Sequence, residues 1–284
     1  LVSATSAALK VISQTQPTLV MGFGGFASGP GGLAAKLKGI TLIIHEQNAV
    51  AGLTNKVLAK LAKRVFLGFP GAFKPTAKVV TVGNPIRKNI MALNNSKSPL
   101  LENGELLNHS LRVLVMGGSR GALALNKNLP WLLADGLNKG KFEVRHQVGA
   151  GRLDATQDFY QSAEINNNSA LVLEEFIDDM ADAFKWANLV ICRAGASTVS
   201  EVAAAGLAAV FIPYPYAVDD HQSANANWLV NAQAAICISE NDLTQATGEK
   251  QLKTLLASPQ KINLMANKAR EMALLDAAEQ VADF

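Results

Sequence analysis

One run of thirteen residues carries a strand, a glycine turn and the start of a helix: Leu189-Val190-Ile191-Cys192-Arg193-Ala194-Gly195-Ala196-Ser197-Thr198-Val199-Ser200-Glu201. Four consecutive apolar residues are typical of a strand that is buried on both faces. A glycine permits a tight turn, and the small polar residues after it favour a helix N-terminus. The order strand, turn, helix predicts a parallel α/β sheet.

The same order recurs along the chain. Strands are expected at residues 18–22, 40–44, 64–68 and 79–82, and again at 112–116, 142–147, 170–173, 189–192, 208–212 and 234–237, with helical patterns between them. The polar stretch between the two groups indicates a linker. The chain is therefore predicted to form two Rossmann-like domains with a crevice between them: residues 1–93, a linker at 94–110, residues 111–267, and a helix at 268–284 that returns toward the first domain.

Composition sets broad limits on the function. The 284 residues are 49% hydrophobic, which is enough to bury two cores. Cys192 and Cys237 lie far apart in apolar runs and are expected to be reduced core residues, and no metal site is visible. No apolar run approaches the ~20 residues that span a bilayer. The sequence begins inside a helical pattern, so we expect a further segment upstream.

Charge is divided unevenly. Residues 1–92 contain eleven Lys or Arg and a single acid, Glu46, whereas the remainder holds 15 basic and 22 acidic residues. The first part is therefore expected to face an anion: a phosphate-bearing substrate, a nucleic acid or an acidic membrane surface. Lys56, Lys60, Lys63 and Arg64 are predicted to lie along one helix, which favours the membrane. No nucleic acid partner is expected, because residues 1–92 have no Trp or Tyr and no recognised motif.

Three glycine-rich turns lead from a strand into a helix, at residues 22–32, 117–121 and 193–201. Glycine lets the backbone approach a ligand, and the first turn of the helix offers free N–H groups and the positive end of the dipole. Such turns bind phosphates. Each of them could instead be only a tight turn, but three in one chain favour phosphate binding.

The first turn also fits a dinucleotide fingerprint. Gly22, Gly24 and Ala27 have the required spacing, and Glu46 follows the next strand as a ribose-binding acid would. This alternative, an NAD-dependent dehydrogenase, is disfavoured because Pro30 suits the first position of a helix that begins after a longer loop. We expect no cofactor.

The third turn has two interpretations. Thr198 and Glu201 fit a capping box, in which Thr198 caps the helix and Glu201 bonds back to its backbone. A carboxylate one turn into a helix that faces a crevice could also accept the hydroxyl groups of a ribose. The ligand role is favoured for Glu201.

Several longer motifs resemble one family. They are Gly24-Gly25-Phe26-Ala27-Ser28-Gly29-Pro30-Gly31-Gly32, His45-Glu46-Gln47-Asn48, Val82-Gly83-Asn84-Pro85-Ile86-Arg87, Phe176-Ile177-Asp178-Asp179-Met180 and Asp220-His221-Gln222. They resemble the MurG family of bacterial enzymes, which transfer N-acetylglucosamine from UDP-N-acetylglucosamine (UDP-GlcNAc) to undecaprenyl-diphosphate-linked muramyl pentapeptide in peptidoglycan synthesis. The resemblance implies the GT-B glycosyltransferase fold, no catalytic metal, and a peripheral position on the cytoplasmic face of the cell membrane.

The resemblance also implies roles for individual residues. Ile177 would contact uracil and Glu201 the ribose, while Gln222 would hold the sugar. The diphosphate would lie against Ser119, Ala196, Ser197, Thr198, Val199 and Ser200. Asn48 and Arg87 would reach across from the first domain. Gly24, Gly25, Ser28 and Gly29 would bind the diphosphate of the lipid acceptor.

The sequence offers two candidates for the general base. His45 or Glu46 is the candidate, because both follow a strand and could take the proton of the attacking hydroxyl, although both could instead only orient loops. Two other functions stay open. One is a UDP-sugar 2-epimerase, which needs no acceptor. The other is a non-catalytic UDP-sugar-binding relative, because the opening glycine-rich segment of the family is absent.

Overall fold

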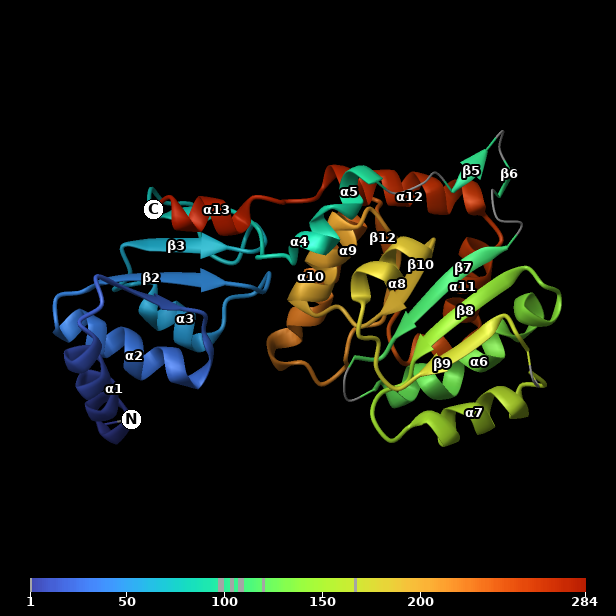
Figure 1. Cartoon of the computed structure of the whole chain (residues 1–284), viewed down its shortest axis with the longest axis horizontal. Coiled ribbons are helices and arrows are strands. Elements are labelled where there is room, and N and C mark those ends of the chain that lie inside the picture. Colours follow the sequence, from blue (N-terminus) through green and yellow to red (C-terminus); the bar gives the residue numbers. More distant parts are fainter. Residues whose placement is uncertain (1, 97–99, 103–104, 107–109, 119–120, 166–167) are drawn as a thin grey trace. The chain divides into compact units, whose positions relative to one another are not determined.

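The computed structural model describes residues 2–96, 100–102, 105–106, 110–118, 121–165 and 168–284, which form two compact units (Figure 1). Unit 1 consists of Leu1–Pro85 and Leu274–Phe284. Unit 2 consists of Ile86–Ala273. The chain therefore passes between the units at two places, after Pro85 and after Ala273.

Unit 1 is a four-stranded parallel sheet with helices on both faces. Its strands, in sheet order, are β1 (Leu19–Gly22), β2 (Thr41–Glu46), β3 (Arg64–Leu67) and β4 (Val79–Thr81). Its helices are α1 (Val2–Thr15), α2 (Gly25–Leu37), α3 (Leu53–Leu58) and α13 (Ala277–Ala282). Leu58 of α3 packs on one face of the sheet, with Leu42 and Ile44, whereas Ala277 of α13 packs on the other, with Ile43 and Phe66.

Unit 2 contains a six-stranded parallel sheet in the order β12-β11-β10-β7-β8-β9. The strands are β7 (Leu111–Met116), β8 (Phe142–Gln147), β9 (Leu171–Glu174), β10 (Leu189–Cys192), β11 (Ala208–Phe211) and β12 (Ala235–Cys237). This is the doubly wound order of a Rossmann fold, in which the winding reverses between the first strand, β7, and the fourth, β10. The predicted fold class is confirmed.

Helices cover both faces of this sheet. They are α4 (Lys88–Met91), α5 (Leu93–Ser96), α6 (Leu123–Asn138), α7 (Leu153–Ser162), α8 (Met180–Trp186), α9 (Ala196–Ala204), α10 (His221–Asn231), α11 (Ala246–Leu256) and α12 (Pro259–Glu271). The core between β7, β8 and α6 is aliphatic, with Val113, Val115, Leu125 and Leu129 fully buried. The rigid sheet fixes where each strand ends, and the functional turns follow those ends.

The limits of the units differ from the predicted domain limits. The segment after Pro85 belongs to unit 2, because α4 packs against α8 and α9. The predicted linker is also not featureless, since β5 (Leu101–Glu102) and β6 (Glu105–Leu106) pair as an antiparallel hairpin. The assignment of these regions to acceptor and donor domains remains a proposal.

The predicted basic helix is wrong. Helix α3 ends at Leu58, and the chain then turns, with the N–H groups of Leu61 and Ala62 both donating to the Leu58 carbonyl. The Lys78 Nζ donates to the Ala59 carbonyl oxygen at 2.5 Å. Of the four cations expected on one helix, only Lys56 is helical.

Candidate functional site

The reversal point of the unit 2 sheet brings two glycine-rich turns together. Strands β7 and β10 are hydrogen-bonded neighbours, and Met116 and Cys192, their last residues, lie opposite each other. The chain leaves β7 toward β8 on one side and leaves β10 toward β11 on the other. Open α/β sheets bind their ligands beyond the carboxyl ends of such strands. This edge is therefore the candidate ligand site of unit 2.

The turn after β10 opens α9 without any side-chain cap. Gly195 is the cap residue, with an extended backbone (φ −63°, ψ 147°), and the Val199 N–H donates to its carbonyl oxygen at 2.9 Å. The N–H groups of Ala196 to Thr198 form the first turn and have no partner within the helix. The capping-box interpretation is therefore wrong, because the helix begins two residues before Thr198.

Glu201 is instead paired with Arg87. The Nε of Arg87 donates to Oε1 of Glu201 at 3.0 Å, and its Nη2 donates to Oε2 at 3.1 Å. The Glu201 side chain is 16% exposed and the Arg87 side chain is 50% exposed. Arg87 was predicted to reach over from the first domain, but it belongs to unit 2 as the cap residue of α4. The structure thus places both residues in one unit and in direct contact.

The turn after β7 is shaped by close backbone approach. Gly121 has a left-handed backbone (φ +68°), and a Cβ there would lie 2.2 Å from the Val148 carbonyl oxygen. Gly118 is also left-handed (φ +77°), yet a Cβ there would meet no atom of the described residues within 4 Å. Ser119, the predicted diphosphate contact in this turn, lies outside the described residues.

Three buried polar side chains, linked by hydrogen bonds, hold Val148, the residue that Gly121 of this turn approaches. The Asn126 Nδ2 donates to the Val148 carbonyl oxygen at 2.9 Å, so its Oδ1 is left to accept from His146 Nε2 at 3.1 Å. The Tyr160 hydroxyl then donates to His146 Nδ1 at 3.0 Å. Burial lowers the pKa of His146 to about 3 and raises that of Tyr160 well above its usual value, so both are neutral. Sequence reasoning missed these hydrogen bonds, although a histidine in a strand predicted to lie inside a parallel sheet is a usable signal.

The predicted uracil contact lies between β9 and α8. Ile177 is buried, and Asp179 two residues later caps α8 by accepting from the Asp182 N–H at 3.0 Å. This fixes the segment that leads out of β9. The uracil role of Ile177 stays a prediction.

Gln222, the predicted sugar contact, lies in the first turn of α10. Its Oε1 accepts from the Tyr214 N–H at 2.9 Å, which leaves the amide nitrogen as its remaining hydrogen-bonding group. Tyr214 packs edge-to-face on Tyr216, with ring centroids 5.6 Å apart. The Arg193 guanidinium lies 5.5 Å from the Tyr214 ring and bonds Ile212 and Pro213 carbonyl oxygens at 3.1 and 3.0 Å. Sequence reasoning missed the role of Arg193 in fixing this loop.

In unit 1 the first glycine-rich turn is shorter than predicted. Helix α2 begins at Gly25, directly after Gly24, and both glycines are left-handed (φ +70° and +77°). Pro30 lies inside the helix rather than at its start, so the sequence argument that separated this turn from a dinucleotide fingerprint is wrong. Ser28 and Gly29 lie in the second turn of α2, away from its free N–H groups.

His45 and Glu46 end β2 and are both buried. The Glu46 carboxylate holds the loop that follows: its Oε1 accepts from the Asn48 N–H at 3.1 Å, and its Oε2 accepts from the Gly52 N–H at 3.1 Å and Asn55 Nδ2 at 2.8 Å. This geometry favours a positioning role for Glu46 and fixes Asn48 beside it.

His45 is held from the other side. Its Nε2 lies 2.9 Å from the Gly83 carbonyl oxygen and must donate to it, so Nδ1 carries the lone pair. That Nδ1 is buried and has no hydrogen-bond partner among the described residues. Burial lowers the pKa of His45, partly offset by the Gly83 hydrogen bond and the charge of Glu46, so the ring is neutral near pH 7.

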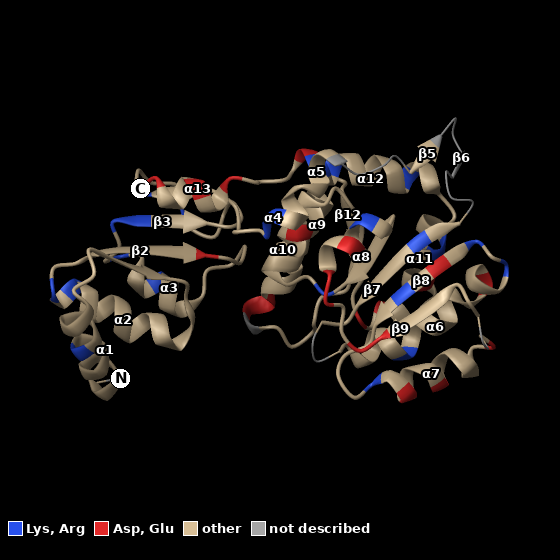
Figure 2. Cartoon of the chain, in the orientation of Figure 1, with Lys and Arg blue, Asp and Glu red and all other residues tan. Residues whose placement is uncertain are grey.

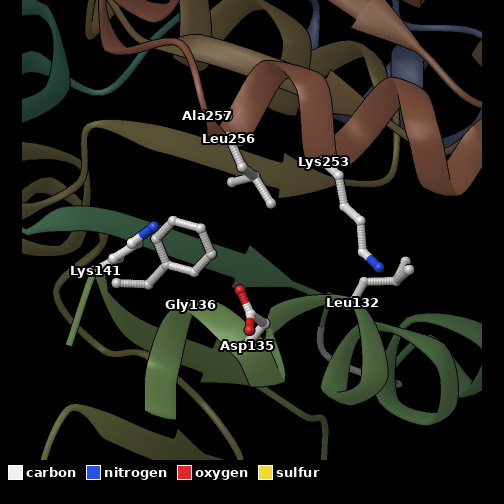
Figure 3. Close-up of a pocket in the computed structure, with 8 residues that line it drawn as sticks. Leu132, Asp135, Gly136, Lys141, Lys253, Leu256 and Ala257 are labelled. Atoms are coloured by element: carbon white, nitrogen blue, oxygen red, sulfur yellow. The ribbon is translucent and has the colours of Figure 1, made fainter. Parts of the chain in front are cut away.

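One cavity of about 240 Å³ in unit 2 lies away from these turns (Figure 3). Its lining includes Gly136 of α6, Phe142 at the start of β8 and Leu256 of α11. Phe142 begins β8 at the amino edge of the sheet, whereas the glycine turns follow the carboxyl edge. We therefore do not assign this cavity to the ligand site.

The described residues contain neither a cluster of metal-binding side chains nor a helix that could span a bilayer. Within those ranges, no three His, Cys, Asp or Glu side chains are grouped closely enough to hold a metal ion. Among the helices that the structure describes, none is both long and apolar enough to cross a bilayer.

Comparison with known proteins gives a consistent result. Residues 1–67 match the N-terminal domain of glycosyltransferase family 28, and residues 112–281 match its C-terminal domain. A relative from Aeromonas hydrophila is 50% identical over 97% of this chain and 73% of its own length. Its name is UDP-N-acetylglucosamine–N-acetylmuramyl-(pentapeptide) pyrophosphoryl-undecaprenol N-acetylglucosamine transferase. A relative of the same name from Pseudoalteromonas atlantica is 43% identical over 99% of this chain and 74% of its own.

Solved structures agree with the sequence matches. The crystal structure of Acinetobacter baumannii MurG aligns with a TM-score of 0.83 and 42% identity, over 99% of this chain and 76% of that one. A putative UDP-N-acetylglucosamine 2-epimerase from Listeria monocytogenes aligns with a TM-score of 0.69 over 99% of this chain and 77% of that one, but at 15% identity it shows the fold alone. Two parallel α/β units with a ligand edge at the reversal point are the architecture of the GT-B fold. The chain belongs to glycosyltransferase family 28 and, within it, to the MurG family.

Proposed function

We propose that this chain transfers N-acetylglucosamine from UDP-GlcNAc to undecaprenyl-diphosphate-linked N-acetylmuramyl pentapeptide, a step of peptidoglycan synthesis. The observation that carries the proposal is the near full-length identity of 50% to a transferase of that name. The geometry supports it, because the reversal point of unit 2 offers the free N–H groups that a nucleoside diphosphate needs.

We assign the donor nucleotide to the carboxyl edge of unit 2. The first turn of α9, from Ala196 to Thr198, would hold the diphosphate with N–H groups and the positive end of the helix dipole. Glu201 would take the ribose, Ile177 the uracil, and the Gln222 amide nitrogen a sugar hydroxyl. Ser119 would complete the diphosphate site.

We assign the leaving-group chemistry to the same edge. As the bond from the sugar to uridine diphosphate breaks, negative charge grows on the phosphate oxygens. Fixed N–H groups and the Arg87 guanidinium would stabilise that charge.

Unit 1 would bind the acceptor. Two consecutive left-handed glycines, Gly24 and Gly25, open α2 and would hold the acceptor diphosphate. His45 carries a buried lone pair on Nδ1, whereas the Glu46 carboxylate already accepts three hydrogen bonds at 3.1 Å or less. If either residue takes the proton of the attacking hydroxyl, His45 is therefore the better candidate and Glu46 would position the loop.

We further propose that unit 1 binds an anionic membrane on the cytoplasmic face. Unit 1 as a whole has nine basic and four acidic residues, and three of those acids lie near α13 (Figure 2). Helix α13 covers one face of the sheet with those acids, whereas the exposed Lys36, Lys38, Lys56 and Lys60 lie on or just after α2 and α3, which pack on the other face. That side also exposes Phe26 (99%) and Leu53 (78%), and apolar side chains among cations are typical of peripheral membrane binding.

Nucleotide binding tests the donor assignment. In calorimetry with EDTA present, the chain should bind UDP and UDP-GlcNAc, and ADP should bind at least about tenfold more weakly if a uracil site exists. A requirement for Mg²⁺, or equal binding of ADP, would contradict the assignment.

A transfer assay tests the reaction. With a lipid-linked muramyl acceptor, UDP should be released in step with acceptor consumed. Conversion of UDP-GlcNAc to a second UDP-sugar without any acceptor would instead identify a 2-epimerase, and UDP binding without either reaction would identify a binding protein.

A further inference from the structure

Arg87 occupies the carboxylate of Glu201, which the ribose of the donor nucleotide is expected to use. Arg87 donates from Nε to one carboxylate oxygen at 3.0 Å and from Nη2 to the other at 3.1 Å. This is a side-on fork in which each oxygen takes one N–H. The inference below rests on the proposed function, in which Glu201 binds ribose.

A ribose would need the same two oxygens. Its neighbouring 2′ and 3′ hydroxyl groups are two parallel donors, as are the two N–H groups of the guanidinium fork. Arg87 takes one acceptor site on each oxygen, and at 16% exposure the Glu201 side chain offers little open surface beside the guanidinium. Ribose and Arg87 therefore compete for Glu201.

The Arg87 side chain can move away from Glu201. Its side chain is 50% exposed, and it caps α4 through its backbone, so moving the side chain does not disturb the helix. A half-exposed ion pair is weak, so a ligand can displace Arg87 if the guanidinium finds a new anion or if the contacts of the ribose are stronger than the pair.

A diphosphate supplies that anion. The first turn of α9, where the diphosphate would lie, begins five residues before Glu201 on the same helix, which corresponds to about 7 Å along its axis. An arginine side chain can span this distance, and guanidinium matches phosphate oxygens in a fork as it matches a carboxylate.

We propose that Arg87 is a specificity-determining residue that discriminates nucleoside diphosphates from nucleosides. In the free protein it closes Glu201 to a ribose. A nucleoside without phosphate must break the pair and leave the guanidinium without a partner. A nucleoside diphosphate breaks the same pair and pairs Arg87 again, now with its own phosphate oxygens.

Replacing Arg87 should change the affinities of uridine and UDP in opposite directions. In the full chain, Arg87→Gln should tighten uridine about threefold, because the competitor for Glu201 is gone, and weaken UDP about ten- to hundredfold, because a charge-assisted contact is lost. Both affinities are measured by NMR titration of the labelled protein, with EDTA present. If Arg87→Gln fails to fold, Arg87→Lys replaces it, since an ammonium cannot form the fork and the same two signs are expected.

A second ion pair in unit 2 provides the matched control. Arg145 contacts Glu174 with a similar fork, at 3.2 Å from Nε and 3.4 Å from Nη2. Arg145→Gln removes the same charge from the same unit, and both affinities should stay within about twofold of the original chain. In a Glu201→Gln background, Arg87→Gln should no longer tighten uridine.

The outcomes separate this inference from the proposed function. Uridine binding that is unchanged, weaker or undetectable in Arg87→Gln overturns the inference, as does UDP binding that keeps its full strength. Failure of the original chain to bind UDP overturns the donor assignment itself. Tightening of uridine together with loss of UDP affinity supports the competition for Glu201.

Discussion

His146 lies fully buried in the strand that leads to the second glycine turn, and both of its ring nitrogens are used. Nε2 donates to Asn126 and Nδ1 accepts from Tyr160. A protonated ring would have to donate at both nitrogens, yet the Tyr160 hydroxyl is already a donor there. Burial and this arrangement together hold the ring neutral, with a pKa lowered from the ordinary 6.5 to about 3.

This shift makes stability depend on pH with a definite sign. As the pH falls below 6.5, the unfolded chain takes up a proton at this histidine that the folded chain refuses until about 3. The free energy of unfolding should therefore decrease with falling pH, by about 1 kcal/mol per pH unit from this residue. Urea unfolding between about pH 6.5 and 4.5 should show a shallower decrease for His146→Gln than for the original chain. Parallel decreases would mean that His146 is not neutral in the fold.

Gly118 and Gly121, in the turn after β7, both have a left-handed backbone, and substituting them separates the cost of backbone strain from the cost of a steric clash. Gly118→Ala meets only the cost of a left-handed backbone, about 1–2 kcal/mol, because a Cβ there has open space around it. Gly121→Ala should cost about 1–3 kcal/mol more, since its Cβ would lie 2.2 Å from the Val148 carbonyl oxygen. Thermal unfolding measures both. Equal losses would show that the loop moves away at no cost.

At the scale of the element, strands were predictable and helix starts were not. Every predicted strand is present, and β8 and β10 have the predicted bounds. Strand β10 was predictable because a buried parallel strand is a short apolar run, here with a glycine turn after it. Helix α2 begins earlier than predicted because glycines, rather than a proline, open it. Helix α9 begins earlier because Gly195 caps it through its backbone, a role that leaves no side-chain signature.

The residues of the candidate site were likewise predictable only in part. Motifs at strand ends located the glycine turns and Glu201, since the carboxyl ends of parallel strands share one edge. The partner of Glu201 could not be predicted, because Arg87 lies 114 residues away and meets it only through the packing of α4 on α9. The buried contacts among Asn126, His146 and Tyr160 are likewise long-range.

Helix α8 has an explicit side-chain cap that can be tested. Asp179→Ala removes the acceptor of the Asp182 N–H at 3.0 Å and should lower the free energy of unfolding by about 1 kcal/mol. Asp178→Ala, at the exposed neighbour, removes the same charge and should change stability by less than about 0.5 kcal/mol. Urea unfolding of both variants gives the comparison, and equal losses would argue against the cap.

At the scale of the whole molecule, the division of charge differs from that expected. Residues 1–92 carry eleven cations and one acid, but the last segment of the chain returns to unit 1 with Asp276, Glu279 and Asp283. Those acids lie at α13, on the opposite face of the sheet from α3 (Figure 2). The acids of unit 1 are therefore grouped on one face, and under the proposed membrane role the opposite face would meet the anionic surface with Lys36, Lys56 and Lys60.

Vesicle binding tests this orientation. Each cation near an anionic leaflet contributes about 1 kcal/mol, so reversing Lys36, Lys56 and Lys60 to Glu should abolish co-sedimentation with vesicles that contain anionic lipid. All three side chains are exposed, on or just after α2 and α3. Binding by the original chain should also weaken from about 0.01 M to 1 M salt, as the Debye length falls from about 30 Å to 3 Å.

The control for that experiment places the same charge change in unit 2. Lys127, Lys250 and Lys261 are exposed there, and reversing them to Glu lowers the net charge by the same amount. The unit 2 variant should keep most of its vesicle binding, because net charge alone does not orient a protein. The unit 1 variant should keep its UDP binding, because its reversed residues lie outside unit 2. Equal loss of vesicle binding in both variants would mean that binding follows net charge. Vesicle binding that resists 1 M salt would mean that Phe26, Leu53 and their apolar neighbours insert without help from the cations.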